Sequence, residues 1–392
     1  MGMIRCRSRG AGLALREKRA DRPLRIIHAA SFGFKPVKAF LHNTAIKISN
    51  GMVRGGHHVV NFSVRDVVRW AGWFGSRAHG SGRARKILLN YCVAMRPDVL
   101  VLGHADLIDS ETIARIREAL PDLKVLQWNV DWLASLDEAV PGDNTARSNW
   151  SKILAKDSCV DATFATTGGP ALKILAGRLS GITAYLPNAT DPSIETARSF
   201  EHDDLPVSVF FASSSSDRRR FHAGAWRDMG EMIADLRVAV PQARVAAYGF
   251  DGLPPVYGPG LQDALASARI GLNISRRNDM FLYSSDRLAQ MVGNGLVGCV
   301  DRATGFGTIF GDDEMVFYAN EEELFSQIDR LSRDDAARRA IGGRGWRRYQ
   351  DLFGCDVVAR YMLDVVFEEH DPADYSWPTL ADRHPSQAKP PA

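Results

Sequence analysis

Residues 98–130, "DVLVLGHADLIDSETIARIREALPDLKVLQWNV", decide the fold class. An apolar run over 98–104 is followed by helical periodicity over 110–119 and by a second apolar run over 124–130. Short apolar runs separated by a helical pattern of this length are typical of a strand, a helix and a second strand in a parallel sheet. The stretch therefore predicts an α/β protein built from β–α–β units.

The same alternation extends in both directions along the chain. In the first half it predicts strands over 24–30, 58–63, 161–167 and 183–188 and helices over 45–54, 83–95 and 145–156. In the second half it predicts strands over 207–213, 244–250, 270–275, 296–300 and 314–319. The helices expected there are 225–237, 260–268, one from 285, 322–331, 335–353 and 355–368.

A polar stretch with two prolines, residues 188–206, interrupts this alternation. We therefore expect two tandem Rossmann-like domains over 23–188 and 207–368, joined by a linker over 189–206. The ends, 1–22 and 369–392, are basic or proline-rich and lack periodicity, so both are expected to be disordered tails.

Composition excludes several classes of protein. The chain has 392 residues, and its 49 Lys+Arg against 46 Asp+Glu leave a net charge of only +3, which gives no general basis for binding nucleic acid. Its five cysteines are scattered, as expected of reduced thiols in a cytoplasmic protein. The basic first 22 residues lack the apolar segment of a signal peptide. An alternative interpretation of this basic end is weak attraction to an anionic membrane surface, which would place the protein at the inner face of the membrane.

Parallel sheets bind ligands at the carboxyl ends of their strands, so residues that follow strands are the candidates. In the first half these residues include Asp131, which follows a strand and stands between Trp128 and Trp132 in the sequence. A carboxylate beside aromatic surface suits a general base with a raised pKa, and aromatic faces suit sugar stacking. A plain loop aspartate is the alternative, and His104, Asp106 and Asp109 compete for the same role. His42, Asn43, Arg65 and Asp66 flank the first helix and second strand and are expected to face the same cleft.

In the second half, residues 280–300 read "MFLYSSDRLAQMVGNGLVGCV" and place Ser285 where a helix N-cap is expected. Capping does not explain Arg287, because a cation in the first turn opposes the helix dipole. A bound anion would reverse that sign, and Arg276 and Arg277 add positive charge from the end of the preceding strand. The alternative is a solvated arginine cluster paired with Asp279 and Asp286.

Tyr248 and Gly249 also follow a strand, and a glycine there would let the backbone approach a flat ligand. The glycine-containing loop after the first predicted strand does not match G-x-G-x-x-G, and the chain contains no H-E-x-x-H, G-x-S-x-G or G-x-x-x-x-G-K-[ST] motif. Dinucleotide-binding, metalloprotease, α/β-hydrolase and P-loop interpretations are therefore not supported.

Four segments together resemble the nucleotide-sugar glycosyltransferases of the GT-B fold. They are "NGMVRGGHHVVNFSVRD" (50–66), "PNATD" (187–191), "SSDRLAQMVGNGLVGCV" (284–300) and "EMVFYANEEELFSQIDRL" (314–331). The last two are similar to the donor-binding half of the CgeB-like glycosyltransferases. The resemblance implies two Rossmann-like domains that face a cleft, with C-terminal helices, and a sugar moved from a nucleotide donor to a glycan.

The resemblance implies that residues 284–295 contact the phosphates and ribose of the donor, and the positions that follow strands supply the other candidates. The donor-binding set is Tyr248, Gly249, Arg276, Ser284, Ser285, Arg287 and Gln290, and the acceptor-binding set is His42, Asn43, Arg65, Asp66 and His104. Many retaining relatives have glutamates where this chain has Gln290 and Leu282. The absence of that acidic pair favours inversion, with Asp131 as the catalytic base.

The sequence therefore predicts a cytoplasmic, metal-independent glycosyltransferase of polysaccharide biosynthesis. Its acceptor is expected to be a glycan or glycolipid of the surface polysaccharide or lipopolysaccharide type, with no cofactor and no metal site. A nucleotide-sugar epimerase of the GT-B fold is an alternative. A non-catalytic nucleotide- or sugar-binding protein is another, because the acidic pair is missing.

Overall fold

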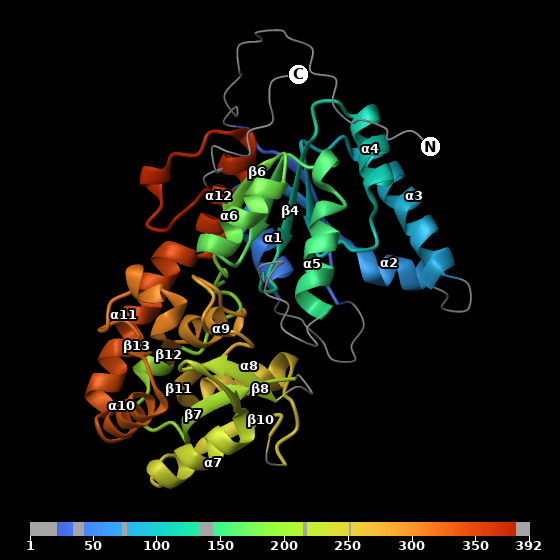
Figure 1. The fold of residues 1–392 in the computed structure, drawn as a ribbon. Helices are drawn as coiled ribbons and strands as arrows, with labels where there is room; N and C mark the ends of the chain where they lie inside the picture. The colour runs from blue at the N-terminus through green and yellow to red at the C-terminus, as the bar shows by residue number, and fades with distance from the viewer. Residues whose placement is uncertain are drawn as a thin grey trace.

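The computed structural model describes residues 22–33, 43–72, 77–133, 144–214, 218–250 and 252–381, without the side chains of 77–79 and 144–147. Figure 1 shows two α/β units, one above the other, each built around a sheet. The first sheet has six parallel strands in the order β2-β1-β3-β4-β5-β6, and the second has five in the order β10-β7-β11-β12-β13. The predicted α/β class and the two tandem Rossmann-like sheets are confirmed.

The first sheet is formed by β1 Arg25–Ala30, β2 His58–Ser63, β3 Val99–Gly103, β4 Lys124–Asn129, β5 Ala162–Ala165 and β6 Ile182–Tyr185. Its helices are α1 Thr44–Arg54, α2 Val64–Ala71, α3 Arg77–Met95, α4 Ser110–Ala119, α5 Asn144–Leu154 and α6 Gly169–Arg178. All five residues of β3 are buried, as expected where helices cover both faces of a parallel sheet. Sequence periodicity missed α2 and α6.

The second sheet is formed by β7 Val207–Ala212, β10 Val245–Tyr248, β11 Ala268–Asn273, β12 Val297–Asp301 and β13 Val316–Tyr318. Its helices are α7 Met229–Ala239, α8 Gly258–Ala266, α9 Arg287–Gly293, α10 Glu321–Arg333 and α11 Asp335–Phe353. A hairpin of β8 Arg219–His222 and β9 Ala225–Asp228 precedes α7, where a helix from 225 was expected. Ala223 and Gly224 have positive φ angles and turn the chain there, and the Asp228 side chain then caps α7.

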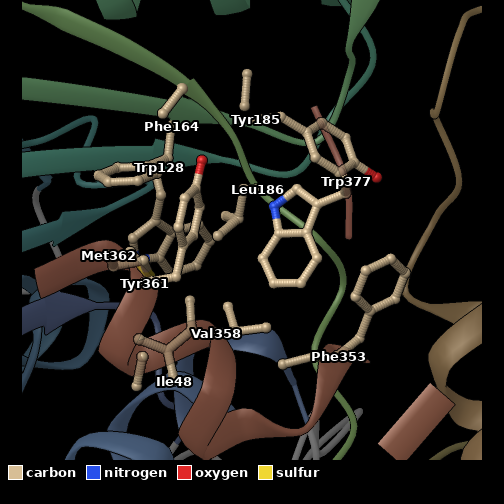
Figure 2. Close-up of a cluster of buried hydrophobic side chains, with 14 of the residues drawn as sticks. Ile48, Trp128, Phe164, Tyr185, Leu186, Phe353, Val358, Tyr361, Met362 and Trp377 are labelled. Atoms are coloured by element: carbon tan, nitrogen blue, oxygen red, sulfur yellow. The ribbon is translucent and has the colours of Figure 1, made fainter. Parts of the chain in front are cut away.

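The chain returns to the first sheet at its end. Helix α12, Cys355–Phe367, packs against α1, and Figure 2 shows Tyr361 and Met362 of this helix among side chains of the first domain. Beyond it, Trp377 is buried in the same cluster, and the Tyr185 backbone N–H donates to the Thr379 carbonyl at 2.8 Å. The expectations that α12 completes the second domain and that a disordered tail begins at 369 therefore do not hold through residue 381. Apolar residues at helical spacing predict a buried face without saying which sheet covers it.

The predicted linker, residues 189–206, forms hydrogen bonds and a buried ion pair with other parts of the chain. Thr190 exchanges backbone hydrogen bonds with Phe353 (2.9 Å) and Cys355 (2.8 Å). The Glu195 carboxylate forms an ion pair with the Lys47 ammonium of α1 at 2.5 Å, and both side chains are buried. The polar composition of this stretch thus reflects internal ion pairs as well as solvent contact. The boundaries at 188 and 207 stay a proposal.

Both sheets have a topological switch point. β1 lies between β2 and β3, and β7 lies between β10 and β11, so successive connections leave in opposite directions. In sheets of this kind the crevice at the carboxyl end of that strand pair is where ligands bind. The first domain's loops after β4 and β5 touch the segment after β11, which shows that the two carboxyl edges face each other.

Candidate active site

The segment 280–284 of the second domain lies against the first domain. The Gly168 backbone N–H donates to the Phe281 carbonyl at 2.8 Å. The Asn188 side-chain amide donates to the Ser284 carbonyl at 2.8 Å and to its hydroxyl at 3.1 Å. Ser284, which was predicted to bind the donor, is thus buried and engaged with the first domain in this conformation.

Arg287 lies at the switch point of the second sheet. Its Nε donates to the Ala212 carbonyl at the end of β7 (3.1 Å), and its Nη1 donates to the Ile274 carbonyl just after β11 (3.0 Å). The guanidinium also lies 5.2 Å from the centre of the Phe211 ring. Burial, together with the nearby Arg220, lowers the pKa of Arg287 to about 10, so the group stays charged at neutral pH.

Arg220 of β8 is a site residue that sequence reasoning missed. Its side chain is 4% exposed and donates to the Ser213 hydroxyl at 2.9 Å, just beyond the end of β7. Its charge lowers the pKa of Arg287, so the two guanidiniums lie in each other's field. Two neighbouring cations at the carboxyl edge make a local positive potential that suits a diphosphate. The run of three arginines over 218–220, soon after a strand, was the available signal.

The helix after this segment begins later than expected. It starts at Arg287, so Asp286 occupies the N-cap position without a side-chain capping bond, and the prediction that Ser285 caps the helix is wrong. The Ser285 backbone N–H instead donates to the Ser275 hydroxyl at 3.0 Å. Gln290 donates to the Asp286 carboxylate at 3.1 Å, one turn back along the helix. Ser285 and Gln290 therefore border the switch point.

The remaining predicted donor residues surround the same edge. Gly249 has φ of +92°, and a Cβ there would meet the Ser213 carbonyl oxygen at 2.1 Å, so glycine is required where the ends of β7 and β10 converge. Tyr248, the last residue of β10, is half-buried. The Arg276 carbonyl accepts the Phe221 N–H at 3.0 Å, which ties the loop after β11 to the β8–β9 hairpin.

Arg277 links the two domains through aromatic rings. Its guanidinium is 5.2 Å from the Phe221 ring centre and 5.8 Å from the Trp132 ring centre, and its Nε donates to Asp279 at 2.7 Å. The expected arginine–aspartate pairing is therefore present for this arginine. The Trp132 indole is buried in that contact, so its face is covered in this conformation.

In the first domain, His104 and Asp131 lie together at the carboxyl edge. The Val130 backbone N–H donates to His104 Nε2 at 3.3 Å, so in the neutral ring the proton is on Nδ1. Nδ1 lies 3.9 Å from the Asp131 carboxylate, whose side chain is 44% exposed. Burial lowers the pKa of His104, and the charges of Asp131 and Asp106 oppose that effect. The ring is therefore a neutral donor that faces Asp131.

The other predicted acceptor residues have local partners. Asn43 caps α1 by accepting the Ile46 N–H at 3.2 Å. The Asp66 carboxylate accepts the Ser63 hydroxyl at 2.5 Å. Arg65 lies 3.8 Å from Asp106. His42 lies outside the described residues. These contacts stabilise the edge of the first sheet and leave the acceptor-binding roles as predictions.

Tyr283 connects the two halves of the site and was also missed by sequence reasoning. It packs with Trp132 of the first domain and is almost fully buried. Burial raises the pKa of the Tyr283 hydroxyl, the charge of Asp131 raises it further, and the charge of Arg287 lowers it. The hydroxyl therefore lies in the field of both candidate groups, one from each domain.

Comparisons with known proteins agree with this architecture. Residues 218–364 match the family model described as glycosyl transferase-like. Sucrose-phosphate synthase from Thermosynechococcus elongatus aligns with 88% of this chain and 98% of its own at 13% identity and a TM-score of 0.57. The α,α-trehalose 6-phosphate synthase from Burkholderia multivorans aligns with 88% and 98% at 9% identity and a TM-score of 0.53. Anabaena Alr3699/HepE, solved in complex with UDP-glucose, aligns with 88% and 100% at 10% identity and a TM-score of 0.50.

The fold and the facing carboxyl edges define a GT-B protein, as the resemblance in the sequence predicted. The family match covers residues 218–364, so glycosyl transfer by the whole chain and the CgeB-like subtype both stay predictions. A search of curated proteins finds no significant match. Within the part of the chain that the structure describes, no helix is both long and apolar enough to cross a bilayer.

Proposed function

We propose that this chain is a glycosyltransferase that moves a sugar from a nucleoside diphosphate donor to a hydroxyl of a glycan or glycolipid, of the surface polysaccharide or lipopolysaccharide type. The observation that carries the proposal is the pair of cations Arg220 and Arg287 at the switch point of the second sheet. Asp131 of the first domain faces this pair across the site, because the charges of Asp131 and Arg287 both act on the Tyr283 hydroxyl. The family of residues 218–364 and the UDP-glucose in the HepE complex support the choice of donor.

Arg287 is suited to hold the leaving group. Two backbone carbonyls, from Ala212 and Ile274, use two of its five N–H groups and fix the plane of the guanidinium. Arg220 adds a second charge at the same edge. Preorganised cations stabilise the charge that develops on a departing diphosphate, so we propose that transfer needs no metal ion. Activity that survives a chelator is the expected result, and activity restored only by added Mg²⁺ or Mn²⁺ would contradict this part.

Asp131 is the proposed base for the acceptor hydroxyl. The His104 nitrogen that faces Asp131, 3.9 Å away, carries the proton in this tautomer and therefore cannot accept one from a substrate hydroxyl there. The Asp106 carboxylate is already paired with the Lys152 ammonium at 3.1 Å and lies 3.8 Å from the Arg65 guanidinium. Asp131 is the more exposed carboxylate, and a base that deprotonates the attacking hydroxyl directly gives inversion.

The test is Asp131→Asn, which keeps the shape and removes the basicity. We expect kcat to fall by about 10²–10⁴-fold, the usual contribution of a general base, while nucleotide affinity stays unchanged. The assay is release of nucleoside diphosphate from UDP-, GDP- and dTDP-sugars, with and without a glycan acceptor. Asp66→Asn, Asp106→Asn and His104→Gln are the comparison variants.

Two outcomes would contradict the assignment. If Asp131→Asn keeps wild-type kcat while one comparison variant loses it, the base is that other residue. If nucleotides bind but no variant, wild type included, releases diphosphate or transfers sugar, a non-catalytic nucleotide-binding protein becomes the better description.

A further inference from the structure

A group of basic side chains surrounds one carboxylate beside His104. The Asp106 carboxylate lies 3.1 Å from the Lys152 ammonium of α5 and 3.8 Å from the Arg65 guanidinium of α2. Lys156, one turn beyond Lys152, is 6% exposed. A small cavity of about 20 Å³ lies among His104, Asp106, Lys152 and Lys156. We call Arg65, Lys152 and Lys156 the basic cluster.

The charges of the basic cluster do not balance. Arg65 and Lys152 share Asp106, and among the described residues the Lys156 ammonium forms no ion pair; its hydrogen bond goes to the Lys152 backbone carbonyl at 3.1 Å. Burial and the charge of Lys152 lower the pKa of Lys156, against the opposing effect of Asp106. Burying an unpaired ammonium and placing two lysines four residues apart are both unfavourable. A second anion at this place would remove both costs.

The charge of the first-domain sequence up to residue 188 has the same sign. Residues 22–188 hold 21 Lys+Arg against 13 Asp+Glu, whereas residues 189–368 hold 20 against 27. The proposed donor half, whose substrate is an anion, is thus acidic overall and depends on local arginines. The half that would hold the acceptor is basic overall, which attracts anions from a distance.

We propose that the basic cluster binds an anionic group, a phosphate or a carboxylate, carried by the acceptor. The word acceptor rests on the proposed function, whereas anion binding itself does not. The cavity has room for about one water molecule. The anion therefore binds at its mouth, where the side chains of Lys152 and Arg65 are 36% and 53% exposed and can turn from Asp106. The buried Lys156 supplies fixed positive charge beneath them.

The experiment is isothermal titration calorimetry with three sugars that share the glucopyranose ring and differ at C6: glucose 6-phosphate, glucuronate and glucose. We expect an anionic sugar to bind and glucose not to bind. Lys152→Met and Lys156→Met should each weaken that binding about tenfold or more, as expected on removing one charged hydrogen-bond partner. Asp106→Asn should tighten it, because the competing carboxylate is neutralised. Lys173→Met on α6 is the matched control, and it should leave affinity unchanged.

Lys152 is partly exposed, so its variant is expected to fold even if a substitution at the buried Lys156 disturbs the domain. Binding unaffected by Lys152→Met and Lys156→Met would overturn the proposal, as would equal binding of glucose or binding of neither anion. The stronger of the two anionic sugars identifies the group as phosphate or carboxylate.

The diphosphate-release assay separates this proposal from the proposed function. Lysine-dependent binding of an anionic sugar without any turnover would leave the anion site standing and remove the glycosyltransferase proposal. If sugar is transferred to a neutral acceptor at a rate that Lys152→Met and Lys156→Met do not change, the glycosyltransferase proposal stands and the anion site is removed.

Discussion

Arg287→Ala should weaken the binding of nucleoside diphosphates while the chain stays folded. The guanidinium is oriented by the carbonyls of Ala212 and Ile274 at 3.1 and 3.0 Å, so its remaining N–H groups are available to a ligand at the switch point. A hydrogen bond to a charged group contributes about 1.5–3 kcal/mol. Loss of one such bond to phosphate raises Kd about 10–150-fold, because each 1.4 kcal/mol is a factor of ten.

Arg269→Ala is the matched control. Arg269 also donates to a backbone carbonyl, that of Leu205, at 2.9 Å, but it lies at the amino end of β11, away from the switch point. Both variants are expected to lose some stability, since each leaves a carbonyl without its partner. Titration calorimetry with UDP, GDP and dTDP, together with urea unfolding, separates affinity from stability. Equal destabilisation with unchanged nucleotide affinity in Arg287→Ala would show that this arginine only ties β7 to β11.

Two further predictions concern buried ionisable groups. Lys47→Met should lower the free energy of unfolding in urea by about 3–5 kcal/mol, because it leaves the Glu195 carboxylate buried and unpaired. Adding Glu195→Gln should restore most of that stability. If the double variant does not recover it, the loss comes from packing and not from the unpaired charge. Burial lowers the pKa of the His28 imidazole to about 3, so below pH 6.5 the unfolded chain binds a proton there more readily than the folded chain does. The contribution of neutral His28 to the free energy of unfolding is therefore fully present above about pH 6.5 and is lost as the pH falls toward 3. Between pH 7.5 and 5.0 this costs about 2 kcal/mol, which His28→Gln should lack; the same pH dependence in both proteins would assign the acid sensitivity to other groups.

Much of the local structure could be predicted from the sequence. The strand over 58–63 and the helices over 110–119 and 335–353 have the expected bounds, and most of the other predicted helices and strands differ from the structure by only a few residues at their ends. Hydrophobic periodicity reports which way successive side chains face, and this depends on backbone geometry alone. The order of strands and helices then restricted the fold to doubly wound sheets, and the positions after strands directed attention to Arg287 and Asp131.

The pairing of side chains was decided only by the tertiary structure. Arg287 meets carbonyls 75 and 13 residues away, and Arg220 reaches its neighbourhood through a hairpin that the sequence did not reveal. His104 and Asp131 come together because β3 and β4 are adjacent in the sheet. Helix α12 could cover either sheet as far as its pattern shows, and it lies on the first because the chain crosses back to it. Periodicity is a property of one segment, whereas these contacts depend on how several segments share one interior, and the free energy that selects among such arrangements belongs to the folded chain as a whole.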